Sequence, residues 1–148
     1  MRSTGVRQWR RLSRYPHMAG EDVPIWERYL AERPNWADSV EYDVEVGPAE
    51  LTGVQETPFA VAVAERLSRR RIDAVASVGD EVWVIEVKPR LSMSALGQVL
   101  VYRHWLRNEI GASRRVMALI VFEAPSVSVS PVAISYGVGL WRVSRGTA

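Results

Sequence analysis

The chain has 148 residues, of which 47% are hydrophobic and 24% are charged, a composition typical of a folded globular domain rather than of a disordered chain. It contains no cysteine, so disulfide scaffolds, cysteine zinc sites and cysteine nucleophiles are excluded. The longest apolar run, residues 116–122, is too short to cross a bilayer, and the arginine-rich start lacks the apolar segment of a secretory signal. We therefore expect no association with a membrane.

The first segment is strongly basic. Residues 1–20 carry five arginines and no acid, whereas residues 21–56 carry ten acids and two arginines, so a net charge of +2 hides blocks of opposite sign. We expect residues 1–20 to form a basic arm, partly helical around residues 9–12, ahead of a single domain over residues 21–148. Such a basic block is suited to binding a polyanion such as nucleic acid. Trp9 of the arm could then stack on a base. The alternative is a solvated arm or a contact with a partner protein.

A helix and a strand are expected next. Pro24 fits the first turn of a helix over residues 25–32, and Pro34 ends that helix. Residues 40–46 alternate apolar and polar side chains, as a half-buried strand does. Residues 59–67 leave two alternatives open, a helix after a proline or part of a long hairpin.

A hairpin follows and is the clearest local feature of the sequence. Residues 72–78 and 82–87 are typical of strands, and the Gly-Asp pair at 79–80 is typical of a tight turn between them. Residues 94–108 have the pattern of an amphipathic helix. The continuous apolar run over residues 116–122 indicates a buried central strand.

The C-terminal residues extend this arrangement. Residues 131–136 predict a short helix, and residues 138–143 predict a last strand. The order is therefore helix, strand, strand, strand, helix, strand, followed by a helix–strand extension. This order predicts an α/β fold in which helices flank a mixed sheet.

Three charged residues are expected to meet at one end of the predicted hairpin. Glu86 and Lys88 point to the same face because Val87 separates them, and Asp73 lies at the start of the partner strand. Lys88 is the only lysine among nineteen basic residues, which suggests a position where arginine would not serve. Converging carboxylates repel each other, and a hard cation such as Mg²⁺ or Mn²⁺ relieves the repulsion. The alternative is a salt-bridged Asp73 beside a surface Glu86–Lys88 ion pair.

The run from residue 71 to residue 89, RIDAVASVGDEVWVIEVKP, resembles the core of the PD-(D/E)xK nuclease superfamily. That pattern is an aspartate, a hairpin and then acid–any–lysine, here Asp73 followed by Glu86-Val87-Lys88. The resemblance implies a restriction-endonuclease-like fold in which Asp73, Glu86 and the Val87 carbonyl hold Mg²⁺ or Mn²⁺. It also implies that Lys88 orients the attacking water or stabilises charge at phosphorus.

The helix that follows the hairpin resembles the QxxxY element of RecB-like and lambda-exonuclease-like members. Gln98 and Tyr102 stand one turn apart on one helix face and would position metal-bound solvent or the DNA strand. Some members carry a further glutamate on the first helix, for which Glu27 is the best-placed candidate and Glu41 and Glu45 are rivals. The alternative is that Gln98 and Tyr102 lie on the polar side of an amphipathic helix and that Glu27 is a surface residue.

The resemblance implies a divalent-metal-dependent DNA nuclease that hydrolyses phosphodiester bonds without strong sequence specificity, in repair, recombination or phage genome processing. Several arginines lie in basic clusters or beside the predicted site, where they would hold the DNA backbone. These are Arg66, Arg69, Arg70, Arg71, Arg90, Arg10 and Arg11. The alternative is a non-enzymatic phage head-completion, neck or DNA-binding protein that docks on other proteins or on its own copies through the arm. We expect a cytoplasmic protein, or a virion-associated one if a phage encodes it.

Overall fold

A six-stranded mixed sheet lies at the centre of the molecule. The computed structural model describes residues 6, 7, 9–16, 18–49, 53 and 55–145, and only the backbone of residues 6, 7 and 64–68. The strands are β1 (Val6–Arg7), β2 (Ser39–Val46), β3 (Arg70–Val78), β4 (Glu81–Arg90), β5 (Arg115–Ala124) and β6 (Val138–Arg142). They follow one another in chain order across the sheet; β1 to β4 are antiparallel, whereas β5 is parallel to β4 and β6 is parallel to β5. The predicted α/β mixed sheet is confirmed.

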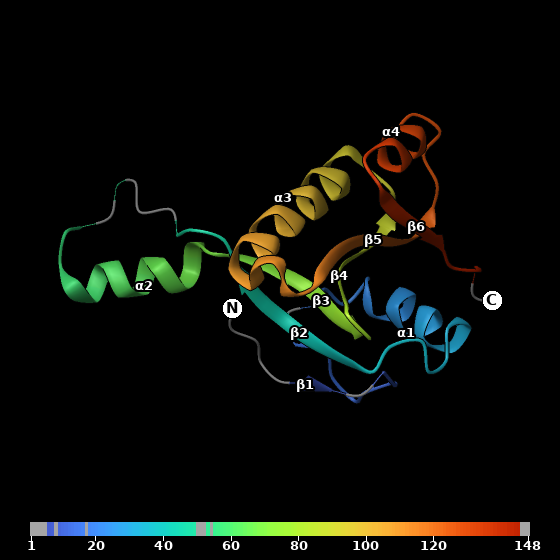
Figure 1. Cartoon of the computed structure of the whole chain (residues 1–148), viewed down its shortest axis with the longest axis horizontal. Coiled ribbons are helices and arrows are strands. Elements are labelled where there is room, and N and C mark those ends of the chain that lie inside the picture. The colour runs from blue at the N-terminus through green and yellow to red at the C-terminus, as the bar shows by residue number, and fades with distance from the viewer. Residues whose placement is uncertain (1–5, 8, 17, 50–52, 54, 146–148) are drawn as a thin grey trace.

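The helices surround this sheet unequally. They are α1 (Val23–Glu32), α2 (Pro58–Ser68), α3 (Met93–Ile110), the 3-10 helix η1 (Gly111–Ser113) and α4 (Ser130–Ser135). Figure 1 shows α1 and α3 on opposite faces of the sheet, α4 beside β6, and α2 standing away from the rest of the molecule. The open alternative at residues 59–67 is thus decided in favour of a helix, which Thr57 caps by accepting a hydrogen bond from the Ala60 N–H. Within the described ranges, none of these helices combines the length and hydropathy needed to span a membrane.

The core is split by the sheet into two clusters, one under each helix. Successive residues of β4 alternate between them, since Val84 packs in the cluster under α3 and Ile85 packs in the cluster under α1. Val99 is a fully buried member from α3, and Trp26 is the corresponding member from α1. Burial of one such side chain contributes about 1.5–3 kcal/mol. Both helices are therefore packed firmly on the sheet. This packing sets where the helix ends lie relative to the ends of the strands.

The N-terminal arm packs more closely than its charge predicted. The prediction of a helix around residues 9–12 is wrong, because these residues form bends and irregular chain after β1, which pairs with β2. Trp9, Tyr15 and Met18 are buried in the cluster under α1, and the Trp9 Nε1–H donates a hydrogen bond of 2.7 Å to the Arg33 carbonyl. The Trp9 ring is thus not free to stack on a base. The division of the chain into arm and domain stays a prediction.

Strand β2 contains an irregularity at Asp43. Tyr42 packs under α1, whereas Val44 packs under α3, so the alternation of side chains shifts by one residue between them. Asp43 has a φ of 53°, in the left-handed region that aspartate tolerates better than most residues. Arg71 donates to both oxygens of the buried Asp43 carboxylate at 2.9 Å. This ion pair holds the irregular backbone opposite the middle of β3.

Candidate metal and active site

The candidate site opens where β3 and β4 separate. The paired register of these strands ends at Ala74 and Ile85, although both strands continue beyond it. There the Asp73 carboxylate accepts a hydrogen bond of 3.0 Å from the Val87 N–H. Across the site, Ile72 packs under α3 and Ala74 under α1, so the side-chain alternation of β3 also shifts at Asp73. The carboxylate is consequently directed toward β4, beside the predicted Glu86-Val87-Lys88 sequence.

The structure brings Asp73, Glu86 and Lys88 together. Glu86 is 2% exposed, its Oε1 lies 3.5 Å from the Lys88 Nζ, and its carboxyl group interacts with that of Asp73. Burial, followed by the charge of Asp73 and the hydrogen bond to Asp73, raises the pKa of Glu86 to about 9 against the opposing effect of Lys88. In the metal-free protein at neutral pH, the protonated form of Glu86 is therefore favoured.

Lys88 supplies the positive charge of this cluster. Partial burial lowers its pKa, but the carboxyl groups of Glu86, Asp73 and Asp22 outweigh that effect and raise the pKa above its ordinary value. Lys88 is therefore an ammonium ion at neutral pH. It can donate hydrogen bonds and balance negative charge, but it cannot accept a proton.

A fourth charged residue, Asp22, joins the cluster and was missed by the sequence analysis. It stands at the N-cap of α1, is 3% exposed, and does not cap the helix with its side chain. Burial first and the charge of Asp73 second raise its pKa to about 6, with Lys88 acting in the opposite direction. An aspartate two residues before Pro24 is a recognisable helix-start signal, but nothing in that signal links it to Asp73.

Helix α3 brings Tyr102 to the same cluster. Tyr102 is 6% exposed, and its pKa is raised by burial, then by the charges of Glu86 and Asp73, while Arg70 lowers it. Gln98 lies one turn earlier on α3, so its side chain shares the face of Tyr102. The two residues of the predicted QxxxY element thus face the acidic cluster.

Unsatisfied oxygen atoms mark this cluster. Within the described part of the chain, three buried side-chain oxygens have no hydrogen-bond partner: Asp22 Oδ1, Glu86 Oε2 and Gln98 Oε1. Buried polar atoms without partners are rare in folded proteins, and a bound ion or water explains them. Oxygen atoms of carboxylates and amides are ligands of Mg²⁺ and Mn²⁺. The donor chemistry therefore fits a hard divalent cation.

The number of protein ligands is small. No group of three or more His, Cys, Asp or Glu side chains among the described residues is arranged to hold a metal ion. A cation at Asp73 and Glu86 would thus rely on backbone carbonyl oxygen and on water for its remaining ligands. Such coordination is typical of Mg²⁺, which keeps several of its water ligands and is commonly bound by one or two carboxylates.

The glutamates proposed for the first helix and strand lie in other surroundings. Glu27 Oε2 is 2.6 Å from the Arg11 Nε, and Glu45 Oε1 is 2.9 Å from the Arg71 Nη2. Glu41 stands opposite Val75 in the β2–β3 register. The first-helix acid that interacts with Asp73 is Asp22, so the structure offers no support for Glu27, Glu41 or Glu45 in the site.

Two of the predicted DNA-binding arginines are engaged within the protein. Arg71 forms ion pairs with Asp43 and Glu45. Arg69 lies 3.1 Å from Glu109 and donates a hydrogen bond of 2.9 Å to the Gly47 carbonyl. Asp43 and Glu45 are buried acids, and a buried charge requires a partner. Arg69 and Arg71 therefore stabilise the fold, which leaves their predicted role on DNA without support.

The other predicted arginines differ in availability. Arg70 is exposed at the start of β3, and Arg90 is exposed at the end of β4, beyond Lys88. Arg10 is exposed, whereas Arg11 pairs with a glutamate. Arg66 belongs to α2, and its side chain lies outside the described residues. Arg70 and Arg90 are thus both exposed at the end of the β3–β4 hairpin that carries the acidic cluster.

Comparisons with known proteins give a match in structure but not in sequence. No family model matches the chain, and no curated protein matches it. A structure described as an EndoMS–dsDNA complex superposes with a TM-score of 0.52 and 16% identity, over 93% of this chain and 51% of that chain. This chain is similar in fold to EndoMS. A repair endonuclease from Pyrococcus abyssi matches with a TM-score of 0.45 and 14% identity, over 70% of this chain and 40% of that one. The chain thus matches about half of the length of the EndoMS chain, and less of the Pyrococcus protein.

Proposed function

We propose that this protein is a divalent-metal-dependent DNA nuclease of the PD-(D/E)xK type. The observation that carries the proposal is the contact between Asp73 and Glu86 beside the only lysine of the chain. The unsatisfied oxygens of Glu86, Asp22 and Gln98 support it, because buried carboxylate and amide oxygens without partners are suited to a hard cation or to its waters. The similarity in fold to EndoMS, a protein whose structure is described as a complex with double-stranded DNA, supports DNA as the substrate.

Three groups would hold Mg²⁺ or Mn²⁺ in this proposal: the Asp73 carboxylate, the Glu86 carboxylate and the Val87 carbonyl. When bound, the ion would neutralise charge on the scissile phosphate and make its water a better nucleophile. Glu86 must release the proton that it holds in the metal-free protein before its carboxylate can bind a cation. The Val87 N–H donates a hydrogen bond to one oxygen of the Asp73 carboxylate. This hydrogen bond would hold Asp73 in place while Glu86 loses its proton.

Lys88 and Asp22 would act directly on the reacting groups. Lys88, as an ammonium ion, would orient the attacking water and stabilise the negative charge that develops on the phosphate oxygens. Asp22 has a pKa of about 6, nearer to neutrality than that of an ordinary aspartate, which suits a group that takes up a proton during hydrolysis. Gln98 and Tyr102 would position the attacking water or the strand from α3.

The test is cleavage of plasmid DNA with Mg²⁺ or Mn²⁺ by the natural sequence and by Lys88→Ala and Asp73→Asn variants. We expect nicking or linearisation by the natural sequence and a loss of roughly 100-fold or more in each variant. Asp80→Asn is the matched control, since Asp80 is a highly exposed carboxylate in the turn at the opposite end of the same hairpin. Equal cleavage by all variants would contradict the assignment. An inactive protein that assembles into rings would instead support the structural alternative.

A further inference from the structure

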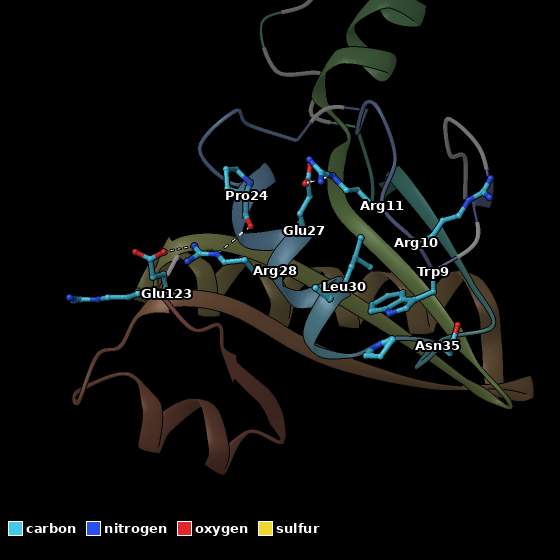
Figure 2. Close-up of a pocket in the computed structure, with 12 residues that line it drawn as sticks. Trp9, Arg10, Arg11, Pro24, Glu27, Arg28, Leu30, Asn35 and Glu123 are labelled. Atoms are coloured by element: carbon cyan, nitrogen blue, oxygen red, sulfur yellow. Dashed lines mark hydrogen bonds and ion pairs between the residues drawn. The ribbon is translucent and has the colours of Figure 1, made fainter. Parts of the chain in front are cut away.

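A pocket that is separate from the acidic cluster lies along α1. It has a volume of about 980 Å³ and is lined by neither Asp73, Glu86 nor Lys88. Figure 2 shows Arg28 and Glu123 at one end and Trp9, Arg10 and Asn35 at the other, with Glu27 and Leu30 of α1 between them. The pocket is therefore an elongated surface feature built on the exposed side of α1 and not an extension of the acidic cluster.

The lining carries an excess of positive charge. Four arginines and two glutamates line the pocket, and both glutamates are neutralised: Glu27 by Arg11 at 2.6 Å, and Glu123 by Arg28. The remaining arginines, Arg10 and Arg145, are exposed and have no hydrogen bond or ion pair within the described ranges. Two guanidinium groups are thus exposed without a counter-charge from the part of the chain that the structure describes, which favours an anionic ligand.

The shape of the lining narrows the class of anion. Between the charged groups the walls are apolar, formed by residues such as Trp9, Leu30, Ala31 and Pro34. A small inorganic anion would use the charges but not these walls. A sugar–phosphate backbone uses both, because its phosphates bind arginine and its sugars pack on apolar surface.

The pocket also adjoins the candidate site. Pro24, which lines it, is two residues from Asp22, and Glu123 follows Phe122, the register partner of Lys88 on β5. Helix α1 has ten residues and is therefore about 15 Å long. A nucleic-acid strand advances about 3.4 Å per phosphate along a duplex, so roughly four phosphates match the length of α1.

We propose that this pocket binds the phosphodiester backbone of a DNA strand that flanks the scissile bond, with Arg10 and Arg145 contacting phosphates. This inference rests on the proposed nuclease function, because only that function makes the bound DNA strand lead into the metal site. It adds a DNA-binding surface outside that site. The Glu27–Arg11 ion pair lies within this surface. Removal of the Glu27 charge would therefore leave Arg11 available to bind a third phosphate.

The experiment measures binding of a fluorescein-labelled DNA duplex by fluorescence anisotropy in EDTA, over a series of salt concentrations. The double variant Arg10→Gln, Arg145→Gln should bind about 10-fold more weakly, and its log–log salt slope should be shallower by about 1.8, or about 0.9 for each phosphate that it no longer neutralises. Arg115→Gln is the control, because Arg115 is an exposed arginine at the opposite end of β5 from Glu123. Equal salt slopes for the natural sequence and the double variant would overturn the proposal.

Glu27→Gln provides a test with the opposite sign. This variant should bind the duplex more tightly than the natural sequence does, whereas a Glu27 that acts in catalysis would lose cleavage without any gain in binding. Thermal melting of each variant verifies that the fold is retained. A separate cleavage assay with Mg²⁺ distinguishes the two proposals. If the protein cleaves DNA but the arginine variants bind DNA normally, only the pocket proposal is overturned. If the arginine variants bind DNA more weakly but the natural sequence does not cleave it, only the nuclease proposal is overturned.

Discussion

The Asp73 carboxylate accepts a hydrogen bond from the Val87 N–H at 3.0 Å, immediately beyond the last paired residues of β3 and β4. The side chain thus replaces the backbone acceptor that a continuing ladder would have supplied. The same carboxyl group interacts with Glu86 and raises the pKa of Glu86. Asp73 therefore has two separable roles, one in the structure of the diverging strands and one in the charge of the site.

Substitutions of Asp73 should separate these roles. Asp73→Asn keeps an oxygen that accepts from Val87, whereas Asp73→Ala leaves a buried N–H without a partner. We expect Asp73→Ala to unfold more readily than Asp73→Asn by about 1–3 kcal/mol, and both to lose cleavage. Urea unfolding followed by circular dichroism measures the difference. Equal stabilities would show that the Val87 hydrogen bond contributes nothing.

The raised pKa of Glu86 predicts a pH-dependent stability in the metal-free protein. The folded state holds this proton up to about pH 9, whereas an unfolded glutamate releases it near 4.5. The contribution of Glu86 is thus fully present below about pH 4.5 and is lost as the pH rises to about 9, with a slope of at most about 1.4 kcal/mol per pH unit. Unfolding free energies in EDTA should show this decline, and Glu86→Gln should flatten it. A Glu86→Gln variant with an unchanged slope would place the titration elsewhere.

Metal binding should reverse that loss. Mg²⁺ competes with the proton on Glu86, so the rise in Tm on adding MgCl₂ should be larger at pH 8 than at pH 6. Glu86→Gln should reduce the rise at both values, since an amide binds the ion more weakly than a carboxylate does. Differential scanning fluorimetry with MgCl₂ and with NaCl of equal ionic strength checks this. A rise that persists in Glu86→Gln would point to a different metal site.

Asp22 should show opposite effects on stability and activity. Because burial and Asp73 raise its pKa to about 6, Asp22 is ionised at pH 8, and its charge is less favourable in the folded state than in the unfolded state. Asp22→Asn should therefore leave stability at pH 8 unchanged or raise it, while cleavage falls by roughly 100-fold if Asp22 takes up a proton. Glu21→Gln is the control, because Glu21 is its exposed neighbour. A stable and fully active Asp22→Asn variant would remove Asp22 from the site.

Local patterns in the sequence were sufficient for the sheet and for the centre of the site. The tight turn at residues 79–80 joins two apolar strands, and the register that follows brings Asp73 to the level of Glu86 and Lys88. In the same way, a spacing of four residues on one helix keeps Gln98 and Tyr102 together wherever that helix packs. These relationships depend on short stretches of chain, and the geometry of strands and helices fixes them.

The partners of the remaining charged residues were decided only by the tertiary structure. Asp22 and Glu27 are close in the chain, but the packing of α1 on the sheet puts Asp22 beside Asp73 and leaves Glu27 with Arg11. Likewise, Arg71 binds a buried Asp43 that is 28 positions away. The sequence alone brought Asp73, Glu86 and Lys88 to one end of a hairpin, because strand alternation and turn geometry are local. The fold decided which acid meets which cation, because those distances depend on how helices and strands far apart in the chain pack together.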